Sequence, residues 1–233
     1  LAHLALIARY GPRWFRAVGT AAEPGSMLTT IYHPDGTGHI TGHVQEAAIG
    51  TPLRTLLAGA DDGVQAWLVG GYHGSWLPMP DAAGITLDNA SLRRFGAAAG
   101  AGVLAALPSG RCGLTETARV TRYLAAESAG QCGPCLNGLP RIAAALAELA
   151  EPGNHRSQTR ADLNRWSGLV EGRGACHHPD GTVRFVRSAL IVFEPEIQRH
   201  ARGHCSATDH RATNHTPFLP LPPGIPTSEE DWT

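Results

Sequence analysis

Residues 127–135 read Glu127-Ser128-Ala129-Gly130-Gln131-Cys132-Gly133-Pro134-Cys135. Two thiols three positions apart, at the mouth of an expected helix and with Gly and Pro between them, can both turn their sulfurs toward one ion or cluster. A third thiol must then come from elsewhere, and Cys176 in Gly172-Arg173-Gly174-Ala175-Cys176-His177-His178 is the candidate. A bare Cys-x-x-Cys pair is shared by zinc sites, redox dithiols and iron–sulfur proteins, so the pair alone leaves its ligand open.

The sequence around these cysteines predicts four helices, because apolar residues recur there at helical spacing. The helices are expected at about 114–128, from 134 to about 152, at about 162–171 and at about 182–201. Short connections between them favour an antiparallel bundle. In an up-and-down bundle the loop of Cys132 and Cys135 and the loop of Cys176 lie at the same end, which supports a shared site. Cys112 falls at the far end of the first helix, about 20 Å away at 1.5 Å per residue, and is left out.

The preceding part of the chain has the short apolar alternations of a sheet. Strands are expected at 27–32, 39–44 and 66–71, with a turn at 34–36 and a short helix opened by Thr51 as N-cap and Pro52 in its first turn. Hairpin, helix and strand together suggest a small β-grasp. A short helix at 92–95 and a buried strand at 103–107 are expected within a Pro-, Gly- and Ala-rich connector.

The predicted fold class is therefore α+β, a small β-grasp module followed by a four-helix bundle. The expected organisation is a junction segment at 1–24, the β-grasp at 25–80, a connector at 81–112, the helical domain at 113–202 and a disordered tail at 203–233. Within that tail His204, Cys205, His210 and His215 are possible metal chelators, although disorder is the expectation for a His-, Pro- and Thr-rich segment without periodicity.

Composition limits the functional classes. The chain has 233 residues, 42% of them hydrophobic, which is enough for one large or two small cores. A net charge of −1 gives no electrostatic case for nucleic acid or for an acidic membrane surface. Five cysteines, two of them in a metal-type pair, indicate a reducing compartment, so a cytoplasmic location is the default. No apolar run approaches the roughly 18 residues of a spanning helix, and direct membrane insertion is not expected.

The string Glu-Ser-x-Gly-Gln-Cys-x-Pro-Cys, taken together with Cys176, resembles the cluster-binding signature of the flavin-bearing, NADH-binding F subunit of respiratory complex I. Relatives of that protein occur in NAD-linked hydrogenases and formate dehydrogenases. Their signature reads Glu-Ser-Cys-Gly-x-Cys-x-Pro-Cys-Arg, and a fourth cysteine further along completes a [4Fe-4S] site. By this resemblance Cys132, Cys135 and Cys176 match the second, third and fourth ligands. Ala129 stands where the first should be, and Leu136 replaces the Arg.

The resemblance extends to the sheet region and to the start of the chain. Thr51-Pro52-Leu53-Arg54 and Gly70-Gly71 match the family's soluble-ligand-binding β-grasp module (SLBB). Residues 1–20 look like the junction that follows the family's Gly-rich nucleotide-binding domain, which carries FMN and NADH. No Gly-rich loop of that kind follows a strand here, so the chain is expected to be a fragment that binds neither NADH nor flavin by itself. Trp14 and Phe15 in the junction should then be partly exposed.

The resemblance implies the electron-transfer portion of an NADH:acceptor oxidoreductase, holding a 4Fe-4S cluster, or a 3Fe-4S cluster if the fourth ligand is absent. Its expected partners are a flavin- and NADH-binding domain or subunit and a ferredoxin-like electron-transfer protein. His178 is the candidate for a substitute fourth ligand, because Cys₃His suits zinc and imidazole also replaces thiolate on iron. The alternative is a non-catalytic docking scaffold, zinc-bound or metal-free. Enzyme activity is left open, since no residue stands out as a nucleophile or general base.

Overall fold

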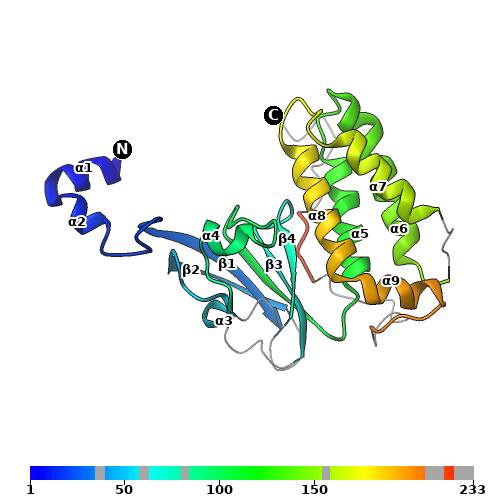
Figure 1. Cartoon of the computed structure of the whole chain (residues 1–233), viewed down its shortest axis with the longest axis horizontal. Helices are drawn as coiled ribbons and strands as arrows, with labels where there is room; N and C mark the ends of the chain where they lie inside the picture. The colour runs from blue at the N-terminus through cyan, green and yellow to red at the C-terminus, as the bar shows by residue number, and fades with distance from the viewer. Residues whose placement is uncertain (35–39, 58–62, 80–83, 154–157, 208–217, 223–233) are drawn as a thin grey trace, which may run out of the picture.

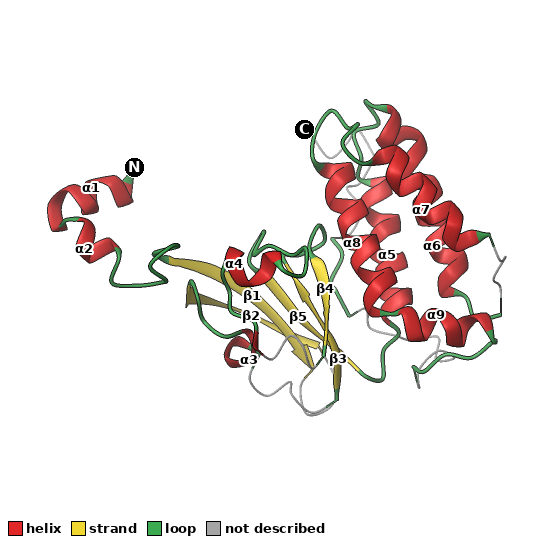
Figure 2. Ribbon diagram, in the orientation of Figure 1, coloured by secondary structure: helices red, strands yellow, loops and turns green. Residues whose placement is uncertain are grey.

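The computed structural model describes residues 1–34, 40–57, 63–79, 84–153, 158–207 and 218–222. A short helical arm at the N-terminus leads into a twisted sheet, and the sheet packs against a bundle of helices (Figures 1 and 2). The α+β class expected from the sequence is confirmed.

The sheet has five strands in the order β2-β1-β5-β3-β4. Strand β1 pairs in parallel with β5, and the other neighbours are antiparallel. A hairpin and a second antiparallel pair thus flank the parallel pairing of β1 with β5. The strands are β1 Ser26–Pro34, β2 Ile40–Ala48, β3 Val64–Val69, β4 Ser75–Pro78 and β5 Val103–Pro108.

The central strand β5 comes from the expected connector, so the sheet runs to Pro108 rather than ending at residue 80. The strands anticipated at 27–32, 66–71 and 103–107 are present, and β2 begins at Ile40, next to residue 39, which lies outside the described residues. Most of the anticipated turn at 34–36 also lies outside them. Strand β4 has only four residues, too few for an alternating pattern to show in the sequence.

Strands β3 and β5 are buried on both faces of the sheet. Successive side chains point to opposite faces, so each strand contributes to two cores. One face packs beneath the short helices α3 (Leu53–Leu56) and α4 (Asn89–Arg93), and the other packs against the bundle. The first face carries Trp67, Val69, Leu104 and Ala106, and the second carries Ala66, Leu68, Ala105 and Leu107.

The two short helices differ in how they begin. Asp88 caps α4, accepting a hydrogen bond from the Ser91 amide at 2.8 Å. The expected cap of α3 is not formed. The Thr51 hydroxyl instead donates to the carbonyl of Ala48 at 2.7 Å, and Pro52 is the residue that precedes the helix.

The bundle consists of α5 Gly113–Ala126, a π-helical turn η2 Pro134–Gly138 that leads into α6 Leu139–Ala150, α7 Thr159–Val170, α8 His178–Val192 and α9 Glu194–Ala201. The expectation of one helix at 182–201 is wrong in two respects. The helix begins at His178 with Pro179 in its first turn, and it breaks at Phe193. Pro195 explains the break, because proline lacks an N–H and its ring clashes with the carbonyl four residues earlier. As a result α9 lies across one end of the bundle (Figure 1).

Trp76 on β4 joins the sheet to the bundle. Its side chain is 1% exposed, its backbone N–H donates to the Ser188 hydroxyl at 2.9 Å, and its indole N–H donates to the Thr117 hydroxyl at 3.0 Å. Phe185 and Phe193 lie around the indole with ring centroids 6.1 Å and 5.2 Å away. These separations lie in the range in which aromatic pairs attract one another beyond their simple burial.

The tail is not disordered throughout, contrary to expectation. Residues 218–222, here called the C-terminal strap, lie between the sheet and the bundle (Figure 1). Phe218 and Leu219 are 0% and 1% exposed, and the Phe218 ring stacks on Trp76 at 6.5 Å. Arg119 of α5 donates to the Leu219 carbonyl, and the Tyr72 hydroxyl donates to the Pro220 carbonyl. The other tail candidates His210 and His215 lie outside the described residues.

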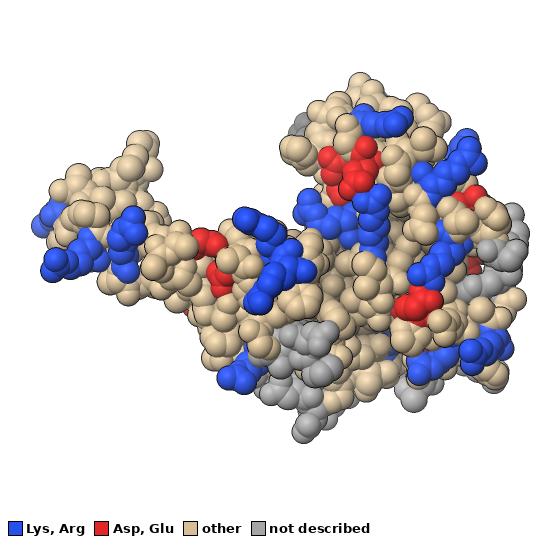
Figure 3. Space-filling model, viewed as in Figure 1, with Lys and Arg blue, Asp and Glu red and all other residues tan. Residues whose placement is uncertain are grey.

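The N-terminal arm, residues 1–20, projects away from the sheet (Figure 1). Its helices α1 (Ala2–Tyr10) and α2 (Pro12–Phe15) contain no buried residue; Trp14 is 42% exposed and Phe15 is half-buried, as anticipated. The arm carries Arg9, Arg13 and Arg16 and no acidic residue, and Figure 3 shows basic side chains along it. Among the described residues no helix combines the length and apolar character needed to cross a membrane.

The strap should contribute to global stability. We expect Leu219→Ala to lower the free energy of unfolding by about 3 kcal/mol, because it empties a fully buried site between two packed layers. Leu169→Ala is the matched control: Leu169 on α7 is 49% exposed, so the same truncation should change stability by less than about 0.5 kcal/mol. Urea unfolding followed by circular dichroism measures both. Equal effects of the two changes would contradict a docked strap.

Candidate metal centre

The three expected cluster cysteines lie on two loops at the same end of the bundle. Cys132 lies in the loop after α5, just before η2, and Cys135 lies in η2 itself. Cys176 lies in the loop that leads from α7 into α8. Cys112, in contrast, is the residue before α5 and lies at the opposite end of that helix. The up-and-down connectivity therefore brings the two loops together as the sequence implied.

Cys132 contacts both Cys135 and the loop that carries Cys176. Backbone N–H groups of Ala175 and of Cys135 hydrogen-bond the Cys132 sulfur and lower the pKa of Cys132. Burial, followed by the Cys132 thiol and the negative charges of Cys132 and Cys176, raises the pKa of Cys135 to about 11. The Cys176 loop therefore touches Cys132 through the Ala175 amide, and Cys176 lies near enough to Cys135 for its charge to raise the pKa of Cys135.

The three thiols differ in exposure. Cys135 is 6% exposed, Cys132 is half-buried and Cys176 is exposed. All three potential ligand atoms are thus sulfurs. Cys135 is the buried one, and Cys176 is exposed to solvent. Thiolate sulfur is the ligand that iron–sulfur clusters take, so these residues fit three of the four corners of a cubane, or all the ligands of a three-iron cluster.

Ala129 adds no donor side chain to this end of the bundle. It is exposed, and its carbonyl accepts a hydrogen bond from the Gln131 side-chain amide at 3.1 Å. Gly130 beside it has a φ of +63°, in the left-handed region that glycine adopts without strain. Because the Ala129 side chain is exposed, a thiol introduced there has room.

His178, the expected substitute ligand, makes contacts away from the thiols. Its Nε2 lies 2.9 Å from the Leu124 carbonyl on α5, and its ring stands edge-on to His73 with centroids 5.0 Å apart. His177 is exposed, with Nδ1 3.6 Å from Asp180. A ligand role for His178 would require Nε2 to give up the Leu124 carbonyl or the other ring nitrogen to reach the site. That role stays a prediction, while the side chain already ties α8 to α5.

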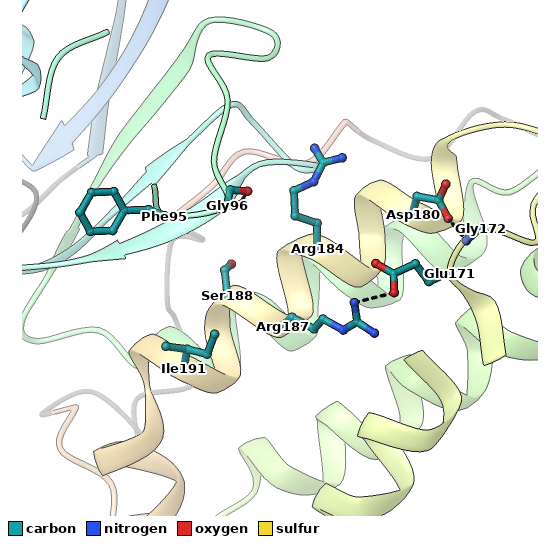
Figure 4. Close-up of a pocket in the computed structure, with 10 residues that line it drawn as sticks. Phe95, Gly96, Glu171, Gly172, Asp180, Arg184, Arg187, Ser188 and Ile191 are labelled. Atoms are coloured by element: carbon teal, nitrogen blue, oxygen red, sulfur yellow. Dashed lines mark hydrogen bonds and ion pairs between the residues drawn. The ribbon is translucent and has the colours of Figure 1, made fainter. Parts of the chain in front are cut away.

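A groove of about 430 Å³ runs along the sheet side of α8, next to the Cys176 loop (Figure 4). Its charged side chains have partners within the protein. Arg187 forms an ion pair with Glu171 at 2.7 Å, Asp180 accepts from the Gly172 amide at 2.8 Å, and Arg184 donates to the His73 carbonyl at 3.4 Å. The groove's contribution to the centre is the Asp180 contact, which anchors the loop that carries Cys176.

The sequence reasoning missed one group of donor side chains. Cys112, Glu196, His200 and Cys205 place four potential ligand atoms within 4.8 Å of one another at the other end of the bundle. Cys112 lies too far from Cys132 to bind the same cluster and is therefore set aside. Cys205 falls in the tail, which the sequence predicts to be disordered. The signal that could have found the group is local: Glu196 and His200 are one helical turn apart, and Cys205 follows shortly after.

The thiols of the metal-free chain should differ in reactivity. Near neutral pH we expect iodoacetamide to modify Cys132 at least about tenfold faster than Cys135, because thiolate is the nucleophile and the two pKa values are shifted in opposite directions. Raising the pH toward 11 should bring Cys135 into reaction. Peptide mass spectrometry of timed samples measures both rates, with the exposed Cys176 as an internal reference. Faster modification of Cys135 would contradict the hydrogen-bonding pattern of the site.

Comparison with known proteins identifies the region around this centre. Residues 115–200 match the family described as NADH-ubiquinone oxidoreductase-F iron-sulfur binding region. The F subunit of the NADH-quinone oxidoreductase of Streptomyces coelicolor is 28% identical over 211 residues, covering 87% of this chain and 45% of the relative. The same subunit of Mycobacterium tuberculosis H37Rv is 29% identical over 203 residues, covering 83% and 43%. The chain thus spans less than half the length of these curated relatives.

A solved structure shares the fold. The NAD⁺-reducing [NiFe]-hydrogenase in the H₂-reduced state matches with a TM-score of 0.72 and 21% identity, over 87% of this chain and 34% of the hydrogenase chain. Residues 115–200 thus match the iron–sulfur binding region of the F subunit of NADH-ubiquinone oxidoreductase, and most of the chain is similar in sequence to the F subunit of NADH-quinone oxidoreductase.

Proposed function

We propose that this chain is the electron-transfer portion of an NADH:acceptor oxidoreductase and holds an iron–sulfur cluster through Cys132, Cys135 and Cys176. The observation that supports the proposal is that the two loops carrying these three thiols meet at one end of the bundle, within the region that matches the iron–sulfur family. A cluster in that position supplies one-electron transfer, and the protein supplies thiolate ligands, partial exclusion of water and hydrogen bonds to sulfur.

The residues of the site favour a relatively high reduction potential. The N–H groups of Ala175 and Cys135 stabilise negative charge on the Cys132 sulfur, and hydrogen bonds of this kind are among the factors that set cluster potentials. Ala129 in place of a thiol removes one negative charge from the surroundings. Both effects favour the reduced state, so the site should be less reducing and more labile than a four-cysteine relative.

The proposed cluster can be tested by anaerobic reconstitution with iron and sulfide. We expect about three to four irons per chain and an electron paramagnetic resonance signal after oxidation or reduction. Ala129→Cys should add the missing thiolate and slow the loss of iron in air. Ala144→Cys is the matched control, because position 144 is exposed on α6, away from the two cysteine loops, and an extra thiol there should change nothing.

Two outcomes would overturn the electron-transfer role. Stoichiometric zinc at Cys132, Cys135 and Cys176 in protein purified without oxygen would favour a redox-silent scaffold that docks partners through the bundle. Failure of the chain to retain iron under conditions that load the Ala129→Cys variant would favour a metal-free scaffold. Loss of iron on Cys135→Ser, with the fold intact by circular dichroism, is the supporting result.

We also propose that the N-terminal arm contacts the flavin- and NADH-binding domain or subunit that supplies electrons, and that a ferredoxin-like protein takes part in the relay. The arm is apolar and basic, and no residue of its helices is buried against the rest of the chain. An exposed apolar surface of this kind is typical of an interaction site.

Limited trypsin digestion tests the role of the arm. In the isolated chain cleavage after Arg9, Arg13 and Arg16 should precede cleavage within the bundle, because fraying exposed helices are the preferred sites of proteolysis. Adding a flavin- and NADH-binding polypeptide that forms a complex with the chain should slow those cuts at least about tenfold. Formation of the complex with unchanged cleavage of the arm would rule out this contact.

A further inference from the structure

A second group of donor side chains closes the opposite end of the bundle. Cys112 immediately precedes α5, Glu196 and His200 lie one turn apart on α9, and Cys205 follows that helix. Their ligand atoms all lie within 4.8 Å of one another. Cys112, Glu196 and His200 are 7%, 6% and 0% exposed, and Cys205 is half-buried. Buried ionisable groups are paired or bind a metal, so the partners of each donor determine what this group can hold.

The backbone around the group is shaped to bring the donors together. Gly113 allows α5 to begin against Phe193, since a Cβ at that position would lie 2.2 Å from the phenylalanine ring. After α9, Gly203 adopts a φ of +79° and its amide bonds the His200 carbonyl at 2.9 Å, while the His204 amide bonds the Arg199 carbonyl at 3.0 Å. This glycine-capped turn reverses the chain and returns Cys205 toward Cys112.

Hydrogen bonds fix the orientation of the imidazole. His200 Nδ1 lies 3.4 Å from the Leu149 carbonyl at the end of α6, so that nitrogen carries the proton. The other nitrogen, Nε2, faces the group, 3.6 Å from the Cys112 sulfur and 3.2 Å from Glu196 Oε1. A histidine that binds a metal almost always donates its second ring N–H to a carbonyl or carboxylate, which is the contact that Leu149 provides.

Hydrogen bonds also fix the orientation of the Glu196 carboxylate. Glu196 Oε1 accepts from the Ser206 amide at 2.7 Å, and Oε2 accepts from the Ser206 hydroxyl at 2.6 Å and from Arg199 at 2.9 Å. These contacts fix the carboxylate so that Oε1 also faces His200, 3.2 Å from Nε2, where it can act as an oxygen ligand.

The two thiols lie against each other. Cys205 and His200 both hydrogen-bond the Cys112 sulfur, with His200 Nε2 at 3.6 Å. A cation that displaces the proton between the two sulfurs gains two sulfur ligands.

We propose that Cys112, His200, Cys205 and Glu196 form a second metal site, which binds a single zinc ion with a structural role. Mixed thiolate and imidazole ligands favour zinc over magnesium or calcium, and structural zinc takes four ligands in a tetrahedron. Zinc–ligand distances of about 2.0–2.3 Å place the donors of a tetrahedron about 3.3–3.8 Å apart, so the group needs only a small contraction around the ion.

The zinc site is separate from the proposed cluster and does not depend on it. Helix α5 has 14 residues and separates Cys112 from the loop of Cys132 by about 21 Å. At its own end of the bundle the ion would tie the start of α5 to the end of α9 and to the segment that follows. The short helix α9 has eight residues, so most of its stability must come from such tertiary contacts.

Metal analysis in a chain without the cluster thiols isolates this site. In the Cys132→Ser, Cys135→Ser, Cys176→Ser background, protein purified under reducing conditions with zinc should retain about one zinc per chain. X-ray absorption should show two sulfur ligands at about 2.3 Å and two nitrogen or oxygen ligands at about 2.0–2.2 Å. Adding Cys112→Ser and Cys205→Ser should reduce the zinc content at least about tenfold, whereas the cluster-thiol changes alone should leave it intact.

A second measurement avoids variants that fail to fold. Titration of the metal-free background chain with Co²⁺ should give thiolate charge-transfer absorption and the intense visible bands of tetrahedral cobalt, saturating at one ion per chain and displaced by zinc. Glu196→Gln keeps the size and an oxygen acceptor for Ser206, and it should weaken zinc binding by about tenfold to a hundredfold with the helical content unchanged. Zinc content unaffected by the Cys112 and Cys205 changes, no uptake of either ion by the folded reduced chain, or a Cys112–Cys205 disulfide in its place would each overturn the proposal.

Discussion

The packing of Trp76 against the bundle is the interaction on which the arrangement of both metal-type sites depends. Trp76 lies on strand β4 and is buried. Its indole N–H donates to Thr117 on α5, and its backbone N–H donates to Ser188 on α8. Gly181 lets α8 approach the β3–β4 turn, because a Cβ there would lie 2.6 Å from the His73 ring. Helix α8 therefore has a fixed position on the sheet. Its first turn presents the Cys176 loop at one end, and its break at Phe193 delivers α9 to the other.

Sequence patterns were sufficient to predict which loops of the bundle lie at the same end. The helical repeats put the loop of Cys132 and Cys135 beside the loop of Cys176, and the resemblance to the F subunit singled out Cys176 within that loop. Features that depend on tertiary contacts were not predictable in the same way. Strand β4 is too short to show an alternating pattern, and Phe218 is buried only because Trp76 and α5 form a surface for it. Cys112 and His200 are 88 residues apart and share no periodic pattern.

The two ends of the bundle offer different chemistry to metals. One presents three sulfurs, the most outward of them exposed, and the other presents two sulfurs, a nitrogen and a carboxylate oxygen in a mostly buried group. Soft all-thiolate sets suit iron–sulfur clusters, whereas the mixed set suits zinc. In the proposed arrangement the redox-active end faces outward toward partners, and the redox-silent end stabilises the scaffold.

The C-terminal strap also has a consequence for how the protein is made. Tyr72 and Pro220 are 148 residues apart, and Phe218 completes the aromatic cluster around Trp76. On the ribosome the sheet and the helices can form as they emerge, but the interface between them stays incomplete until residues 218–222 have left the exit tunnel. Until then the apolar surface around Trp76 is uncovered, so a chain truncated before the strap presents to chaperones and proteases a surface that the finished protein never shows.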